Sequence, residues 1–242
     1  MKLTSEITVR LIDHMGDDAR LAMAAWVSTS AEDGMRRAVE KPDDVKGVLS
    51  YLMKHRHGTP FEHGTMTFFV HAPIFVWREW HRHRIGFSYN EESGRYKTLD
   101  PVFYVPDRER PMFKVDAWKA GRPKFTTIAT SEEESHYDAL CQNLRNSYRV
   151  SYDAYLANLG MGIDPGLARD CLPVGIYSSC WVTCNPRSLM AFLSLRTHEP
   201  DAKQVSYPLW EIDVAARKCE ELFAAHWPIT HAAFVQNGRV AP

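Results

Sequence analysis

The hydrophobic pattern changes its period at Pro73, and this change requires a strand and a helix in direct succession. Residues Thr65–His71 are apolar at every second position, which is typical of a half-buried strand. Proline suits the first turn of a helix, and the spacing that follows predicts a helix over Pro73–His81. A chain with this pattern must combine both kinds of secondary structure.

Helical patterns recur along the rest of the chain and outnumber strands. An apolar stripe predicts a helix at Asp43–His55, and Ser131 with Glu134 forms a capping box before a long amphipathic helix that Gly160 ends. Further expected elements are a short helix from Asp164 that holds Arg169, a strand at Tyr177–Thr183, and helices at Arg187–Arg196 and Trp210–His226.

Two segments rich in proline or charge, Asp107–Thr130 and Thr197–Pro208, are expected to be inserted loops. Neither a repeat nor a shift in composition marks a domain boundary. The sequence therefore predicts the α+β class and one domain over residues 1–242.

The charge balance narrows the classes of partner. Lys and Arg number 29 against 30 Asp and Glu, so no global field attracts nucleic acid or an anionic membrane. The apolar stretch Gly64–Trp77 is too short to span a bilayer, and charges interrupt the N-terminal residues where a signal peptide needs an apolar run. Five cysteines without a CxxC pair fit reduced thiols, and a cytoplasmic location is expected.

The densest chemical feature is the segment Arg82–Tyr96. Its arginines offer forked, permanently charged donors for phosphate or planar carbonyl groups, and Ser93 and Gly94 add neutral donors. Glu91 and Glu92 would repel a simple anion but can accept from ribose hydroxyls or a base NH. A nucleotide has all of these parts.

This segment resembles the signature of the flavin-dependent thymidylate synthases, in which Arg-His-Arg is followed by Ser and then Gly-Arg. Here eight residues separate Arg84 from Ser93. Further matches outside the signature are Tyr51–His55, Thr59–His63, Ala72–Val76, Leu172–Pro173, Arg187–Met190 and Leu195–Arg196.

The resemblance implies transfer of a one-carbon unit from 5,10-methylenetetrahydrofolate to carbon 5 of dUMP, with reduction by an FAD that NADPH has reduced, to give dTMP. It also implies a central antiparallel sheet packed by helices, and a homotetramer that holds its ligands at subunit interfaces.

The resemblance also assigns residues. It places FAD on Ser28, Thr59, Arg82, His83, Arg84, Asn90, Glu91, Asn185, Arg187, Ala191 and His198. It places dUMP on Glu79, Arg82, Glu92, Ser93, Gly94, Arg95, Arg169 and Arg196. Within the second set, Arg95 and Ser93 are expected to take the phosphate, while Arg169 and Arg196 address the uracil edge.

Arg196 is the expected catalytic residue. Activation of uracil carbon 5 requires negative charge on the N3/O4 system, and a fixed guanidinium stabilises that charge without losing a proton. Since the family needs no protein nucleophile, Ser93 is expected to bind substrate only.

Three features depart from the family pattern. Glu79 stands where a neutral glutamine is expected near the nucleotide phosphate, and Ala191 stands where an asparagine would help hold FAD. The loop after Arg196 is longer than expected, so His198, which is assigned to FAD, matches the family pattern less closely than the other residues.

Two rival functions remain to be weighed. A metal hydrolase would use His55, His57, His63, His81 and His83. Such a site needs a carboxylate and another histidine soon after the His55–His57 pair, but Gly58, Thr59 and Pro60 follow it, so no metal is expected. A nucleic-acid module would interleave arginines of the signature with Trp77, Trp80 and Tyr96, but the balanced total charge disfavours it.

Overall fold

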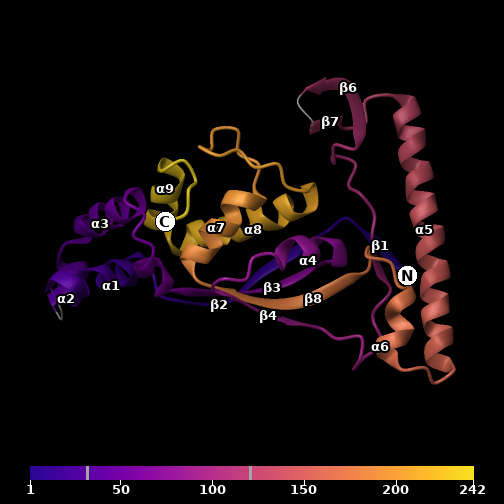
Figure 1. Ribbon diagram of the computed structural model, residues 1–242, viewed down its shortest axis with the longest axis horizontal. Coiled ribbons are helices and arrows are strands. Elements are labelled where there is room, and N and C mark those ends of the chain that lie inside the picture. The colour runs from indigo at the N-terminus through magenta and orange to yellow at the C-terminus, as the bar shows by residue number, and fades with distance from the viewer. Residues whose placement is uncertain (31–32, 120–121) are drawn as a thin grey trace. The chain divides into compact units, whose positions relative to one another are not determined.

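The computed structural model describes residues 1–30, 33–119 and 122–242, and it divides into two compact units (Figure 1). Unit 1 comprises Met1–Glu6, Ala72–Trp77 and Glu92–Ser178. Unit 2 comprises Ile7–His71, Arg78–Glu91 and Ser179–Pro242. Each unit is thus assembled from three separate stretches of the chain.

Unit 1 is organised around one long helix, α5 (Ser131–Gly160). Its other elements are a parallel pair of strands, an antiparallel hairpin and two short helices, namely β1 (Lys2–Thr4) with β5 (Val102–Tyr104), β6 (Phe113–Lys119) with β7 (Arg122–Thr126), α6 (Pro165–Ala168) and the 3-10 helix η2 (Arg169–Cys171). Phe103, Tyr148 and Ile176 form a small buried core against α5. Two buried rings, Phe103 and Tyr148, stack there with centroids 4.7 Å apart.

The capping box of α5 was predicted one residue too late. Thr130 is extended and its hydroxyl accepts from the Glu133 amide at 3.1 Å, while the Glu133 carboxylate accepts from the Thr130 amide at 3.0 Å. Thr130 and Ser131 both stand three residues before a glutamate, so the motif fits two registers. The helix itself, including its end at Gly160, is confirmed.

The expected loop Asp107–Thr130 is wrong in part because it contains the β6–β7 hairpin. The pairing joins Phe113 to Thr126 and Val115 to Lys124. A two-stranded ribbon need not pack one face against a core. Its strands therefore need not alternate apolar and polar residues, which is the pattern that identifies a strand in a sequence. Gly121, which suggested a loop, lies outside the described residues.

Unit 2 holds most of a four-stranded sheet in the order β2–β3–β8–β4. The strands are β2 (Thr8–Met15), β3 (Thr65–Pro73), β8 (Tyr177–Cys184) and β4 (Phe87–Glu91), and the outer pairs β2–β3 and β8–β4 are antiparallel. The predicted alternation in β3 is confirmed, since Met66, Phe68 and Val70 are buried. The mixed α+β class with an antiparallel sheet is likewise confirmed.

Helices of unit 2 cover this sheet and extend beyond it (Figure 1). They are α1 (Asp18–Ser30), α2 (Asp33–Glu40), α3 (Pro42–Lys54), the 3-10 helix η1 (Thr59–Glu62), α7 (Pro186–Arg196), α8 (Trp210–His226) and α9 (Pro228–Gln236), while α4 (Ile74–Trp80) ends in this unit. The predicted helices at α3, α4, α7 and α8 are confirmed, except that Pro73, expected in the first turn of α4, is the last residue of β3. Thr197–Pro208 is the expected loop. Among the described residues, no helix is long and apolar enough to cross a membrane.

Phe192 of α7 is fully buried and joins several elements that carry signature residues. Its ring stacks on Trp80 at the end of α4 with centroids 4.7 Å apart. The same ring meets His83 edge-on at 5.0 Å and Phe87 of β4 at 6.1 Å. Aromatic packing of this kind fixes the signature turn against α7.

A charged cluster ties the end of α7 to the C-terminal helices. Glu220 of α8 accepts from His231 at 2.8 Å and forms two bonds of 2.7 Å with Arg239, whose guanidinium also donates to the Thr197 hydroxyl at 2.9 Å. Arg239 adopts a left-handed backbone with φ 59°, and its carbonyl accepts from the Ser194 hydroxyl. The cluster thus braces the residue next to Arg196.

Acid titration should reveal the contribution of Glu220 to stability. Burial alone would raise its pKa, but hydrogen bonds from His231 and Arg239 lower the pKa from 4.5 to about 2. Because the folded pKa is depressed, stabilisation is present above pH 4.5 and is lost as the pH falls toward 2, on the order of 2 kcal/mol after allowance for solvent screening. Urea unfolding measures the free energy of unfolding of wild type and of Glu220→Gln. The difference between the two should decrease as the pH falls from 4.5 toward 2, and a constant difference would contradict the lowered pKa of Glu220.

Candidate active site

The last residue of α7, Arg196, lies against the signature turn. Its Nε donates to His83 Nε2 at 3.1 Å, and its Nη2 donates to the Glu79 backbone carbonyl at 3.3 Å. Its Nη1 forms an ion pair with Glu79 Oε2 at 2.8 Å. All three nitrogens of the guanidinium are therefore engaged by groups from the end of α4 and the turn that follows it.

His83 is a neutral ring beside this cation. Burial first, and then the charge of Arg196, lower the pKa of His83 from 6.5 to about 4. Since Nε2 accepts from Arg196, the ring proton resides on Nδ1. The Tyr89 hydroxyl donates to the carbonyls of His83 at 2.5 Å and Trp80 at 3.3 Å, which holds the turn in place.

Gly86 brings the signature turn close to the start of α7. Its φ of 67° lies in the left-handed region, and an added Cβ would meet the Ser188 hydroxyl and lie 2.8 Å from Asn185 Nδ2. Asn185 caps α7, because its side-chain oxygen accepts from the Ser188 amide at 2.8 Å. Glycine at this position permits both the turn and the cap.

A cavity of about 600 Å³ opens beside this turn. Its lining residues are Arg56, Glu62, Ile85, Gly86, Asn185, Arg187, Ser188, Ala191, Ala241 and Pro242. Arg187 links two other lining residues. Its Nη1 forms an ion pair with Glu62 Oε1 at 2.6 Å, and its Nε donates to the Pro242 carbonyl at 2.8 Å. The cavity therefore combines a guanidinium, an amide and apolar walls.

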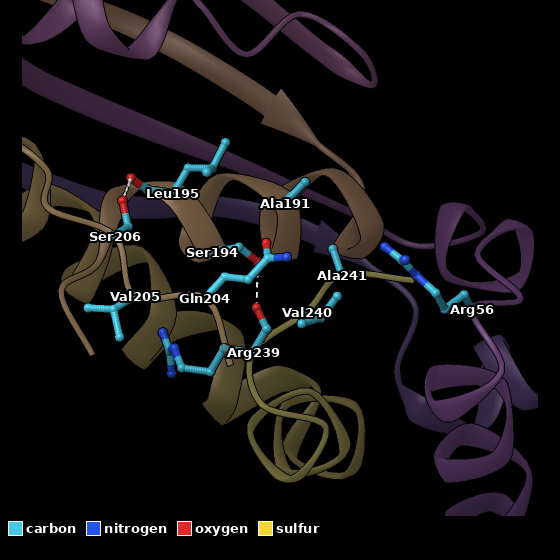
Figure 2. Close-up of a pocket in the computed structure, with 10 residues that line it drawn as sticks. All are labelled: Arg56, Ala191, Ser194, Leu195, Gln204, Val205, Ser206, Arg239, Val240 and Ala241. Carbon is cyan, nitrogen blue, oxygen red and sulfur yellow. Dashed lines mark hydrogen bonds between the residues drawn. The ribbon is translucent and has the colours of Figure 1, made fainter. Parts of the chain in front are cut away.

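A second cavity, of about 420 Å³, continues along α7 (Figure 2). Both cavities share Arg56, Ala191 and Ala241 as lining residues. In Figure 2, Ala191, Ser194 and Leu195 follow α7, with Gln204–Ser206 and Arg239–Ala241 beside it. Bonds of 2.7 Å hold these segments, from the Ser206 hydroxyl to the Leu195 carbonyl and from the Ser194 hydroxyl to the Arg239 carbonyl.

Unit 1 gathers a separate group of signature residues. Gly94 is buried, and a Cβ added to it would lie 3.3 Å from Cδ of Arg169. A Cβ added to Gly166 of α6 would lie 3.5 Å from Cγ of Arg95. The Ser93 hydroxyl accepts from the Arg95 amide at 3.2 Å. Two exposed guanidinium groups thus flank a turn that offers a hydroxyl and backbone NH groups.

Glu92 begins this turn and is balanced by a lysine. Its Oε2 lies 3.2 Å from Nζ of Lys97, which also contacts Asp100 at 3.2 Å. One lysine is therefore shared by two carboxylates, and it holds the Glu92 side chain beside the turn.

Comparison with known proteins decides the family. The family model described as thymidylate synthase complementing protein matches residues 10–229. A flavin-dependent thymidylate synthase of Streptomyces coelicolor is 47% identical over all of this chain and 96% of the relative, and one of Tropheryma whipplei is 45% identical over 98% of this chain and 96% of the relative. The chain belongs to the flavin-dependent thymidylate synthase family.

Solved structures agree with this membership. The crystal structure of a UMP/dUMP methylase, PolB from Streptomyces cacaoi, bound with 5-Br dUMP, is similar with a TM-score of 0.90, 41% identity and complete coverage of both chains. The same methylase bound with 5-Br UMP is similar with a TM-score of 0.87 and 40% identity, over 100% of this chain and 99% of that chain.

Most of the residues that the family resemblance names fall into two local groups. In unit 2, Glu79 and His83 both contact Arg196, and Asn185, Arg187 and Ala191 line the adjoining cavity. Arg82 and Arg84 are exposed in the same turn, and Asn90 and Glu91 end β4. In unit 1, Glu92, Ser93, Gly94, Arg95 and Arg169 form the group described above.

Three predicted flavin residues lie in different settings. Ser28 is exposed on α1, where its hydroxyl donates to the Ala25 carbonyl of the same helix. His198 is turned into its own loop, with Nδ1 2.8 Å from the Ser206 carbonyl. Thr59 begins η1 directly after Gly58, where an added Cβ would lie 2.6 Å from Arg187 Cζ, so Thr59 stands at the edge of the cavity.

Sequence reasoning missed Arg56, Glu62 and the terminal residues Ala241 and Pro242 as parts of the cavity lining. Glu62 occurs inside a segment that resembles the family, but nothing in its local pattern distinguished it. Arg56 has a φ of 59°, a backbone state that sequence alone does not reveal. Over residues 1–30, 33–119 and 122–242, no group of three His, Cys, Asp or Glu side chains forms a metal site.

The neutrality of His83 can be measured directly. We expect NMR titration of the imidazole protons of His83 to give a midpoint near pH 4, because burial and Arg196 both disfavour the charged ring. Arg196→Ala should raise this midpoint part of the way toward 6.5, since burial remains. Arg36→Ala, which removes an exposed guanidinium on α2, serves as the control. A wild-type midpoint near 6.5 would refute the assignment.

Proposed function

We propose that this chain converts dUMP to dTMP. The carbon comes from 5,10-methylenetetrahydrofolate, and NADPH supplies the two electrons through FAD, so that the products are dTMP, tetrahydrofolate and NADP⁺. The observation that carries the proposal is the position of Arg196, held against His83 of the Arg-His-Arg signature at 3.1 Å. Full-length relatives named flavin-dependent thymidylate synthase support it.

The role proposed for Arg196 follows from its surroundings. A guanidinium does not lose its proton near neutral pH, and this one is only 19% exposed. Negative charge that develops on N3 and O4 of a uracil placed beside it would be stabilised by a cation already in position. The neutral ring of His83 adds no competing positive charge.

Phosphate recognition is assigned to unit 1. Arg95 and Ser93 offer a guanidinium, a hydroxyl and backbone NH groups for the phosphate of dUMP, and Arg169 addresses the uracil edge. Glu92 and Gly94 complete the part of the substrate set that lies in unit 1. Arg82 of the Arg-His-Arg signature is a further substrate residue. Ser93 binds substrate and does not act as a nucleophile.

The residues present fit FAD. The 600 Å³ cavity has a volume suited to a large organic ligand and carries the Arg187 guanidinium and the Asn185 amide on its wall. Arg82, His83, Arg84, Asn90 and Glu91 add donors and acceptors for a dinucleotide, with Ser28, Thr59, Ala191 and His198 as further contacts. FAD, when bound and reduced by NADPH, supplies the hydride that completes the methyl group.

The assembly is part of the proposal. We propose a homotetramer in which ligands bind at subunit interfaces, one synthase domain over residues 1–242, a cytoplasmic location, and no stable complex with nucleic acid or membranes. Light scattering coupled to gel filtration measures the number of subunits and tests the tetramer directly.

A product assay tests the activity. Purified protein with dUMP, methylenetetrahydrofolate, NADPH and FAD should give dTMP by mass spectrometry, and a tube without NADPH should give none. A parallel tube with UMP tests the ribose, because the structurally similar PolB is a UMP/dUMP methylase. Absence of methylated nucleotide from every tube would refute the proposal.

Two substitutions should separate catalysis from binding. Arg196→Ala should lower kcat by roughly a hundredfold or more while FAD remains bound, because a fixed charge at the reacting ring is lost. Arg95→Ala should raise KM for dUMP by roughly tenfold to a hundredfold with a smaller change in kcat. Arg36→Ala is the control for loss of a surface guanidinium. Near-native turnover of Arg196→Ala would exclude its catalytic role.

A further inference from the structure

Glu79 binds the guanidinium of Arg196 through both its side chain and its backbone. Its carboxylate contacts Nη1 of Arg196 at 2.8 Å, and its backbone carbonyl accepts from Nη2 at 3.3 Å. The same residue thus approaches two of the three guanidinium nitrogens. The third nitrogen, Nε, donates to His83.

The pair is held from both sides by buried structure. Glu79 directly precedes Trp80, whose ring is buried and stacks on Phe192 of α7. Arg196 directly precedes Thr197, which is buried and accepts from Arg239. Because α4 and α7 are pinned at these neighbours, the two charged side chains meet in a defined geometry.

The pairing changes the charge that a bound nucleotide would experience. An ion pair at 2.8 Å largely balances the guanidinium, and His83 beside it is neutral near pH 7. Arg82 and Arg84, exposed on either side of His83, are permanent cations of the same turn. Glu220, His231 and Arg239 form a further charged cluster that contacts Thr197. Among these groups, Glu79 is the carboxylate that pairs directly with Arg196.

We propose that Glu79 is a positioning residue that fixes the guanidinium of Arg196 and, by partly neutralising it, sets the pH at which a bound uracil loses its N3 proton. A carboxylate repels phosphate, so this role replaces a direct phosphate contact at this position. The inference rests on the proposed dUMP chemistry and extends it to a residue that acts through Arg196.

The sign of the effect is fixed by electrostatics. A positive charge beside N3 favours the ionised uracil and lowers the N3 pKa, whereas the negative charge of Glu79 opposes this. Glu79→Gln removes the negative charge but keeps an oxygen that can accept from Nη1. In this variant the N3 pKa of bound nucleotide should fall.

The test uses the flavin-loaded protein without reductant, so that no turnover occurs. The probe is 5-bromo-dUMP labelled with ¹³C at carbon 4, because the halogen makes N3 more acidic and the carbon shift reports ionisation. We expect the ionisation midpoint of the bound probe to lie about one pH unit lower in Glu79→Gln than in wild type. The pH profile of kcat for dUMP should shift in the same direction.

Two further variants separate charge from structure. Glu79→Asp retains the carboxylate and should restore a midpoint close to that of wild type. Glu134→Gln removes a carboxylate from an exposed ion pair with Arg108 in unit 1 and should change nothing. A structural role for Glu79 alone would alter stability or KM without moving the midpoint.

The outcomes are distinct. A bound probe whose midpoint is the same in wild type and Glu79→Gln overturns the inference while leaving the synthase proposal intact. A wild-type protein that neither binds the probe nor forms dTMP overturns both. A lower midpoint in Glu79→Gln, with recovery in Glu79→Asp, supports the inference.

Discussion

The packing of aromatic rings around Phe192 is the interaction on which the candidate site of unit 2 depends. Phe192 lies one turn before Arg196 on α7, and its ring contacts Trp80, His83 and Phe87. These three residues come from the end of α4, the signature turn and β4. A single buried ring thus aligns the backbone segments that place the charged groups, and the polar contacts add precision to an arrangement that packing has already defined.

The result is a partly buried cation, Arg196, whose neighbours are the carboxylate of Glu79 and the neutral ring of His83. A guanidinium is a permanent cation, whereas burial and the charge of Arg196 lower the pKa of His83 and leave its ring neutral. Burying two cations together would be costly, and neutralising the imidazole avoids that cost. The histidine of the signature therefore acts in this structure as a hydrogen-bond acceptor for the arginine.

Much of the fold could be predicted from the sequence because several elements bury one face. β3 and α3 show clear apolar periods, and α7 and α8 begin and end close to their expected residues. The β6–β7 hairpin could not be predicted in this way, since a lone ribbon lacks a strict apolar alternation. The capping register of α5 was ambiguous because two overlapping tetrads satisfy the same rule.

The residues of the candidate site could likewise be predicted from the sequence only in part. The signature and its spacing led to the residues of the turn, but the ion pair of Glu79 with Arg196 depends on tertiary contact between α4 and α7, which no local pattern encodes. Arg56, Glu62 and Pro242 reach the cavity from distant parts of the chain. Local periodicity carries no information about contacts between residues that are far apart in the sequence.

Arg239 illustrates a constraint of another kind. Its backbone lies in the left-handed region, where glycine would relieve strain, yet its side chain makes the contacts to Glu220 and Thr197. Backbone and side chain thus place opposite demands on one position. Glycine would satisfy the first demand and forfeit the second. Asparagine and aspartate also tolerate the left-handed region, but neither carries the forked donors that bind Glu220 and Thr197.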